Sequence, residues 1–223
     1  MVPVEKSTKL EIIDDPNLPE DIIARVHRDL TLMHRCLGNT GAILRALKRD
    51  PLPVRRVVDI GCGDGGLLRE IRRKLRADVV GVDLRPPTLC ADGVTILQAD
   101  AVRSPLPVSD IAIAVCVVHH LSEAELVDLI RNVGRYCRRF IVLDLVRHPL
   151  PLTLFRLAVG PWVHRVTAED GYRSIRRSYT PAELGVVVTE ALAGTSASFR
   201  HSVAPLYMRQ MVDISYGINQ VVT

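Results

Sequence analysis

The stretch VVDIGCGDGG at residues 57–66 decides how the rest of this chain is interpreted. An apolar, β-branched run ends in Asp59, and a loop of alternating glycines follows it. Leu67, Leu68 and Ile71 then fall at helical spacing. This succession predicts a β-strand, a glycine turn and a helix, the local unit that binds nucleotide-like ligands. Glycine suits such a turn because a side chain there would hold the backbone away from the ligand.

The charge of this loop limits which ligands it can bind. Gly61, Gly63 and Gly66 satisfy G-x-G-x-x-G, a pattern that also suits a dinucleotide. Asp59 and Asp64, however, place carboxylates where a pyrophosphate would have to lie. Like charges about 4 Å apart repel by roughly 4 kcal/mol at an effective dielectric constant of about 20. We therefore expect a cationic ligand, and S-adenosylmethionine carries a sulfonium and an ammonium group but no phosphate.

Four segments in order resemble the class I S-adenosylmethionine-dependent methyltransferases. The first motif of that family is an acid, one apolar residue and G-x-G-x-G, which DIGCGDG at residues 59–65 matches in full. Residues 79–83 look like its second strand, and residues 96–101 look like its third-strand motif. Residues 111–118, with the His-His-Leu turn after them, look like its fourth strand and the following loop. The resemblance covers about residues 55–213, and the order of the segments is more specific than any one of them.

The resemblance implies a fold, a cofactor and a cofactor site. The fold is α/β, with a Rossmann-like seven-stranded, mostly parallel sheet, helices on both faces, one antiparallel strand near an edge, and an N-terminal helical cap. The cofactor is S-adenosyl-L-methionine, whose ribose hydroxyls Asp83 would hold while Asp100 and the next amide meet the adenine. The cofactor-binding residues that follow are Asp59, Gly61, Cys62, Gly63, Asp83, Leu84, Asp100, Ala101 and Cys116.

The chain divides into two parts on this interpretation. Residues 1–54 form an N-terminal helical cap or extension, in which residues 1–18 are expected to be poorly ordered. Residues 55–223 form the methyltransferase domain, with an insertion at about 147–179 that breaks the rhythm of strands and helices. Resembling enzymes of the small-molecule type bind the acceptor with a cap and an insertion at these places.

Composition excludes several classes of protein. At 223 residues and 48% hydrophobic content, the chain is long enough for one well-buried α/β domain. Its formal charge of +4 is too small to indicate nucleic acid. The sequence holds no apolar run of about 18 residues and no signal peptide at its polar start. Five cysteines, an odd number without C-x-x-C spacing, predict free thiols and a cytoplasmic protein.

The expected chemistry is displacement at a methyl carbon, for which the protein mainly holds the nucleophile, the carbon and the sulfur in line. Such orientation contributes on the order of 7 to 11 kcal/mol. His119 and His120 are the catalytic candidates, because they lie where the family's methyl group faces the acceptor and because imidazole titrates near neutral pH. The alternative is that one of them packs in the core and the other caps the following helix.

The acceptor site is expected to draw on the N-terminal helix and the insertion. Arginine binds carboxylates or phenolates bidentately, and aromatic rings stack on an aromatic acceptor. The simpler alternative is surface solvation for the arginines and ordinary helix packing for the histidine. The substrate-binding candidates are His34, Trp162, Tyr172, Arg173 and Arg176.

No metal site is expected from spacing, since His148 and His164 do not stand with cysteines at ligand distances along the chain. Asp144 and Arg147 come after the predicted fifth strand, near enough to the expected site to matter there, and the simpler interpretation is a plain salt bridge.

A small-molecule acceptor is the expected partner. The Asp/Asn-Pro-Pro-aromatic motif of amino-directed nucleic-acid methyltransferases is missing after the fourth strand, so nucleic acid is not expected. The layout resembles bacterial secondary-metabolism enzymes that methylate phenols, quinones or polyketides on a hydroxyl or ring carbon, and peripheral membrane contact would suit a lipid-like phenol. Two alternatives stay open, a nicotinamide-dependent oxidoreductase and a non-catalytic S-adenosylmethionine-binding protein. The oligomeric state is not predicted.

Overall fold

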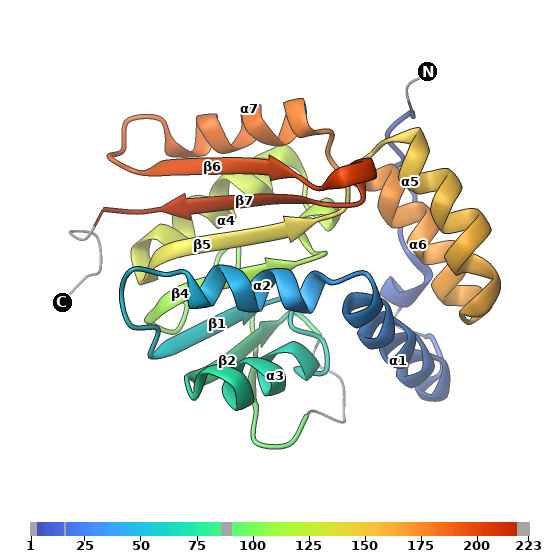
Figure 1. Ribbon diagram of the computed structural model, residues 1–223, viewed down its shortest axis with the longest axis horizontal. Helices are drawn as coiled ribbons and strands as arrows, with labels where there is room; N and C mark the ends of the chain where they lie inside the picture. Colours follow the sequence, from blue (N-terminus) through green and yellow to red (C-terminus); the bar gives the residue numbers. More distant parts are fainter. Residues whose placement is uncertain (1–3, 16, 86–90, 218–223) are drawn as a thin grey trace.

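The computed structural model describes residues 4–15, 17–85 and 91–217. Within these ranges, seven strands form one sheet in the order β3-β2-β1-β4-β5-β7-β6 (Figure 1). β7 runs antiparallel to both of its neighbours, and the other strands are parallel to one another, as the resemblance predicted. The strands are β1 (Arg56–Ile60), β2 (Asp78–Asp83), β3 (Thr95–Gln98), β4 (Ser109–Val115), β5 (Cys137–Asp144), β6 (Ser198–Val203) and β7 (Gln210–Ser215).

Helices cover both faces of the sheet and one of its ends. In Figure 1, α2 and α3 lie in front of the sheet and α4 lies behind it, while α1, α5 and α6 gather beyond the carboxyl ends of the parallel strands. No helix in the described part of the chain is long and apolar enough to cross a membrane. The helices are α1 (Glu20–Cys36), α2 (Asn39–Lys48), α3 (Gly66–Leu75), α4 (Glu123–Tyr136), α5 (Pro149–Leu154), α6 (Arg165–Arg177) and α7 (Pro181–Leu192), with short turns η1 (Ile12–Asp14), η2 (Val118–His120), η3 (Phe155–Val159), η4 (Gly160–Trp162) and η5 (Pro205–Tyr207).

α4 and α7, on the face of the sheet opposite α2 and α3, each begin at a capping box, a Ser or Thr followed three residues later by Glu. The Ser122 hydroxyl accepts a hydrogen bond from the backbone N–H of Glu125, whose carboxylate accepts one from the backbone of Ser122. Thr180 and Glu183 repeat this exchange at the start of α7. Each pair satisfies two backbone donors that the first turn would otherwise leave open, which fixes where the helix begins.

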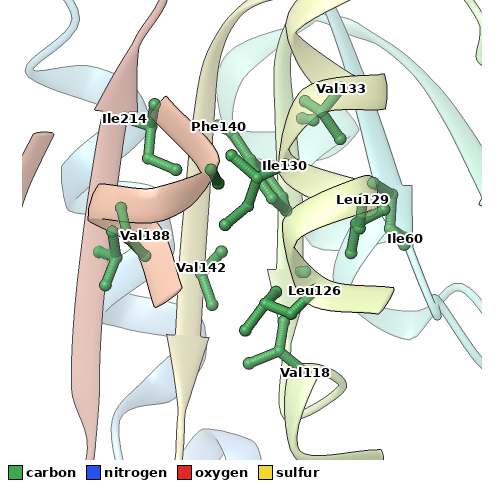
Figure 2. Close-up of a cluster of buried hydrophobic side chains, with 14 of the residues drawn as sticks. Ile60, Val118, Leu126, Leu129, Ile130, Val133, Phe140, Val142, Val188 and Ile214 are labelled. Carbon is green, nitrogen blue, oxygen red and sulfur yellow. The ribbon is translucent and has the colours of Figure 1, made fainter. Parts of the chain in front are cut away.

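Two apolar layers sandwich the sheet, because its central strands are buried on both faces. Ile111, Ile113 and Ile141 point toward α2 and α3. Phe140 and Val142 point the other way, toward α4 and α7, and Figure 2 shows them packed with residues of those helices. The alternation follows from the two-residue repeat of a strand, so each central strand contributes to both layers.

The beginning of the chain differs from the expectation of poor order. The described residues 4–15 pack on α6, where the Asp170 carboxylate accepts hydrogen bonds from the backbone N–H groups of Ile12 and Ile13 at 2.6 and 2.9 Å. The prediction was wrong for this part because the partners of this polar segment lie more than 150 residues away along the chain.

Asp29 joins the helical cap to the insertion. Its carboxylate on α1 accepts hydrogen bonds from the backbone of His164 and the hydroxyl of Thr167, both at the start of α6. α2, in contrast, packs its apolar side chains into the layer in front of the sheet. Two segments far apart in sequence therefore form one cover over the carboxyl ends of the strands.

Gly134 and Gly185 provide a matched test of packing on the far face. A Cβ at Gly134 on α4 would lie 2.7 Å from the Tyr216 ring, whereas one at Gly185 on α7 would meet nothing closer than 4.0 Å. We expect Gly134→Ala to lower the free energy of unfolding by about 1–3 kcal/mol through overpacking. Gly185→Ala should raise it, by up to about 1 kcal/mol, because alanine favours a helix. Urea unfolding measures both, and a Gly134→Ala protein as stable as the parent would contradict this packing.

Candidate functional site

The glycine loop after β1 has the geometry that its sequence predicts. Gly61 and Gly63 have φ angles of +66° and +53°, in the left-handed region that favours glycine. A Cβ at Gly61 would lie 2.5 Å from a methyl group of Val117, so the loop also passes too close to the turn after β4 for any larger residue. The backbone is thereby exposed to the cavity that begins at this loop.

Three predicted carboxylates lie around this loop and face the cavity. Asp83, at the end of β2, accepts hydrogen bonds from the backbone N–H groups of Gly63 and Arg85, each at 2.9 Å. Asp100 accepts one from the backbone N–H of Val102 at 3.0 Å. Backbone donors therefore fix both side chains, and each carboxylate keeps acceptor capacity for a ligand.

Asp59 is the unusual member of the group. It is 2% exposed, and its buried Oδ1 has no hydrogen-bond partner among the residues that the structure describes. Burial, reinforced by the charge of Asp83, raises the pKa of Asp59 well above its ordinary value. A buried carboxyl without a partner is costly, and a cationic group in the cavity would supply the partner.

Asp64 occupies the start of α3, the position at which a phosphate group binds in nucleotide sites. Its carboxylate accepts a hydrogen bond from the backbone N–H of Gly66 at 2.9 Å. One backbone donor at the helix N-terminus is thus already paired with a carboxylate of the chain itself. This geometry disfavours a pyrophosphate at the loop, as the sequence argument expected.

The cavity has a volume of about 1400 Å³ and contains more than the loop. Beyond the carboxylates, its wall is formed by the cover of α1, α5 and α6 and is mainly apolar. Pockets for one small ligand commonly measure about 300–1000 Å³, so this space suits two ligands side by side. The apolar lining residues include Ile23, Val26, Leu30, Met33, Leu154, Phe155 and Ile175.

His119 is held between two carboxylates at the junction of these regions. Its backbone N–H donates to Asp144 Oδ2 at 3.0 Å, and its ring Nδ1 donates to Asp144 Oδ1 at 2.7 Å. Its Nε2 lies 3.3 Å from Glu11 Oε1. Burial alone would lower the pKa of His119, but Asp144 and then Glu11 outweigh it and raise that pKa to about 10. A histidine that is already protonated at neutral pH cannot accept a proton, so this geometry opposes a general-base role for His119.

His120 differs from its neighbour in access. Its side chain is 29% exposed, and its ring nitrogens lie 3.7 Å from Glu11 Oε1 and 3.6 Å from Asp14 Oδ2. The two imidazole rings are 4.4 Å apart between centroids. Both histidines line the cavity, so the structure brings the predicted catalytic pair to the same cavity as the glycine loop.

Glu11 is a residue of the site that the sequence interpretation missed. Its side chain is buried, and the Ser174 hydroxyl donates to its Oε1 at 2.7 Å. Burial opposes its ionisation, but His119, His120 and Ser174 together keep the pKa of Glu11 below its ordinary value. The one local signal was the apolar pair after it within a polar segment, too weak to place a carboxylate in a site.

The five substrate-binding candidates differ in whether they line the cavity. His34 lines the cavity, as do all nine predicted cofactor residues. Trp162, Tyr172, Arg173 and Arg176 are not among the lining residues. Trp162 is 84% exposed, which reflects its position in a surface turn.

Two of these arginines serve the N-terminal segment instead. Arg173 donates to the carbonyl of Leu10 at 2.8 Å, and the carbonyl of Arg176 accepts a hydrogen bond from Ser7. The side chain of Arg173 and the backbone of Arg176 therefore contact residues 4–15, and neither residue lines the cavity.

The predicted Asp144–Arg147 salt bridge is absent from the described ion pairs. Arg147 instead pairs with Glu183 on α7 and donates to the carbonyl of Ser178 at 3.0 Å. The reason is direction, since Asp144 ends β5 facing the turn after β4, while the chain beyond it turns Arg147 toward α7.

Comparison with known proteins identifies the type of domain. A family described as a methyltransferase domain matches residues 57–139, and no curated protein matches the sequence. The plantazolicin methyltransferase BpumL in complex with SAH superposes with a TM-score of 0.67 at 15% identity, covering 91% of this chain and 91% of that one. Human N-acetylserotonin methyltransferase in complex with SAM gives 0.61 at 16% identity, covering 89% and 57%. A putative O-methyltransferase from Nostoc punctiforme gives 0.63 at 15% identity, covering 95% and 64%.

These findings confirm the fold and the family resemblance that the four sequence segments indicated. The matched residues run from β1 to the start of β5, which is the part of the chain that holds the glycine loop and the carboxylates.

The paired charges of His119 predict a pH dependence of stability. Its folded pKa of about 10 exceeds the ordinary 6.5, so the pairing stabilises the fold fully below about pH 6.5 and is lost as pH rises toward 10. We expect the free energy of unfolding to fall between pH 7 and 10, and to fall less steeply in His119→Gln. Urea unfolding across this range measures both slopes, and parallel curves would contradict the assignment, because the other titrating groups are common to both proteins.

Proposed function

We propose that this chain, a class I methyltransferase by its fold and by the methyltransferase domain at residues 57–139, transfers a methyl group from S-adenosylmethionine to a small, largely apolar acceptor. The observation that carries the proposal is the single cavity in which a glycine loop with carboxylates adjoins an apolar space. A phenol, quinone or polyketide-like compound that presents a hydroxyl or a ring carbon suits that space. The proposed setting is the cytoplasm.

The loop region fits this cofactor on chemical grounds. S-adenosylmethionine, when bound, supplies a methyl carbon activated by a sulfonium leaving group. Asp59 has a buried oxygen without a partner that suits a cationic amino group, and Asp83 has acceptor oxygens at a strand end that suit ribose hydroxyls. Two of the similar structures hold SAH or SAM, which supports the same choice.

The role of the protein in the reaction is to orient the acceptor and exclude water. The cover of α1, α5 and α6 encloses the apolar space, and its side chains hold the body of the acceptor by shape. The polar group of Glu11, His119 and His120 lies on the same wall and would receive the acceptor's hydroxyl. Holding the nucleophile in line with the methyl carbon is the main catalytic contribution that such a site offers.

The charge of the site supports a small-molecule acceptor over nucleic acid. The predicted cofactor residues include the three acids Asp59, Asp83 and Asp100, and Glu11 and Asp14 also face the cavity. A phosphate group at the glycine loop would meet these carboxylates, which opposes binding of a polyanion there.

The function is tested by titrating the purified chain with S-adenosylmethionine and, in parallel, with NADH. We expect micromolar binding of the first and none of the second by calorimetry, because carboxylates meet the sulfonium compound and oppose the pyrophosphate. Incubation with phenols and quinones should then give products heavier by one methylene unit in mass spectrometry. Binding of NADH alone would sink the proposal in favour of an oxidoreductase.

Asp59→Asn separates function from stability at the proposed cofactor site. The raised pKa of Asp59 means that its ionisation destabilises the fold at pH values above its ordinary pKa. The neutral amide should therefore leave the free energy of unfolding at pH 7 equal or higher. Affinity for S-adenosylmethionine should fall about tenfold or more, since roughly 1.4 kcal/mol of lost attraction has that effect.

Asp110→Asn is the matched control for this variant. Asp110 lies near the start of β4, at the opposite end of the strand from the cavity, and accepts backbone hydrogen bonds from Arg55 and Arg56 at 2.7 and 2.8 Å. Its change should lower stability and leave cofactor affinity unaltered. Thermal unfolding and calorimetry on both variants decide the matter, and unchanged affinity in Asp59→Asn would remove Asp59 from the site.

A further inference from the structure

Three side chains from two distant segments converge on one point in the cavity wall. Glu11, His119 and His120 each offer one ligand atom, and these atoms all lie within 4.8 Å of one another. The Nε2 atoms of both histidines approach the same carboxylate oxygen, Oε1 of Glu11, at 3.3 and 3.7 Å. We propose that these three residues bind one divalent first-row transition-metal ion, with zinc as its representative.

The separations have the size that a metal ion requires. Ligand atoms about 2.0–2.1 Å from a tetrahedral zinc ion lie about 3.3 Å from one another. The two distances to Glu11 Oε1 are at or slightly above this length, so small side-chain rotations would complete the geometry. An ordinary hydrogen bond would bring nitrogen and oxygen closer, to about 2.9 Å.

His119 is oriented as a metal ligand is. Its Nδ1 is held by Asp144 at 2.7 Å, which leaves Nε2 directed at Glu11. The side chain is 2% exposed, and among the described residues the nearest acceptor, Glu11 Oε1 at 3.3 Å, does not complete a hydrogen bond with this buried nitrogen. A carboxylate behind a histidine that fixes its ring is the arrangement that supports metal-ligating imidazoles. A metal-ligating imidazole is neutral, so the ion would displace the proton that Nε2 of His119 otherwise carries.

Glu11 is positioned by groups outside the cluster. The Ser174 hydroxyl donates to its Oε1, and Asp170 holds the backbone of the next two residues. Its carboxylate is therefore in place before any ion arrives. The Nε2 atoms of two imidazole rings are directed at this oxygen from 3.3 and 3.7 Å, which leaves room for a cation that all three ligand atoms could contact.

The donor set also indicates which ion would bind. Two imidazoles and one carboxylate suit zinc, iron or cobalt, whereas magnesium and calcium prefer oxygen ligands throughout. Three protein ligands leave a coordination position open, and all three residues line the cavity. On the proposed function, the acceptor's hydroxyl oxygen would occupy that position, and the ion would lower the pKa of the hydroxyl. This use of the metal rests on the proposed function, whereas binding of the metal does not.

Calorimetry on the full, untagged chain after removal of metals by a chelator tests the site. We expect one equivalent of Zn²⁺ to bind in the micromolar range or tighter, and Mg²⁺ not to bind. Glu11→Gln and His120→Gln should each weaken zinc binding about tenfold or more, because loss of even a residue that only hydrogen-bonds a ligand changes metal affinity by about that much. Because His120 is partly exposed, its variant is expected to fold even if the Glu11 variant loosens residues 4–15.

Asp15→Asn is the control for the charge change. Asp15 is an exposed carboxylate on the same segment and accepts a hydrogen bond from the backbone of Asn17. The zinc affinity of the Asp15→Asn protein should equal that of the parent protein. X-ray absorption of the zinc-loaded protein should show nitrogen and oxygen ligands at about 2.0–2.1 Å and no sulfur at about 2.3 Å.

Several results would overturn the site: no zinc binding, binding of Mg²⁺ alone, sulfur ligands, or full affinity in both Glu11→Gln and His120→Gln. S-adenosylmethionine titrated into the same metal-free protein separates this inference from the proposed function. Cofactor binding without zinc binding would defeat the metal site alone. Zinc binding without cofactor binding would support the metal site and defeat the proposed function.

Discussion

The buried pairing of His119 with Asp144 is the interaction on which the rest of the site depends. Asp144 ends β5, and its carboxylate fixes both the backbone and the ring of a residue in the turn after the neighbouring strand β4. Buried charges are costly unless they are paired and hydrogen-bonded, so the turn has one stable position. The other face of the same imidazole meets Glu11 from the start of the chain. One side chain thereby sets the cavity wall and docks the N-terminal segment on it.

The charges of the cavity have a structural cost that its function explains. Asp59 is buried at the end of a central strand without a partner for one oxygen, beside the like charge of Asp83. A chain built for stability alone would place an apolar or amide side chain there. Sites that bind a cation keep such carboxylates because the ligand, rather than the fold, completes their interactions.

The cover over the cavity is assembled from pieces that are remote in sequence. α1 precedes the sheet and α6 follows its fifth strand, and Asp29 joins the two through hydrogen bonds at the start of α6. The sheet supplies a rigid edge, and the cover supplies an apolar surface. On the proposed function, the cofactor would bind at the most constrained part of the fold and the acceptor at a part whose shape depends on helix packing.

Local sequence determined the sheet, the glycine loop and the places of the predicted cofactor residues, because strand pattern, glycine turns and capping boxes depend on neighbours along the chain. Asp59, Asp83 and Asp100 could be placed at one sheet edge for the same reason, since parallel strands end together there. The tertiary structure decided what spacing cannot encode. Glu11 reached the site from a segment expected to be poorly ordered, and Asp144 took His119 rather than Arg147 as its partner. Trp162, Arg173 and Arg176 do not line the cavity. Each of these outcomes depends on the direction of a side chain relative to elements distant in sequence, which only the packing of the whole chain fixes.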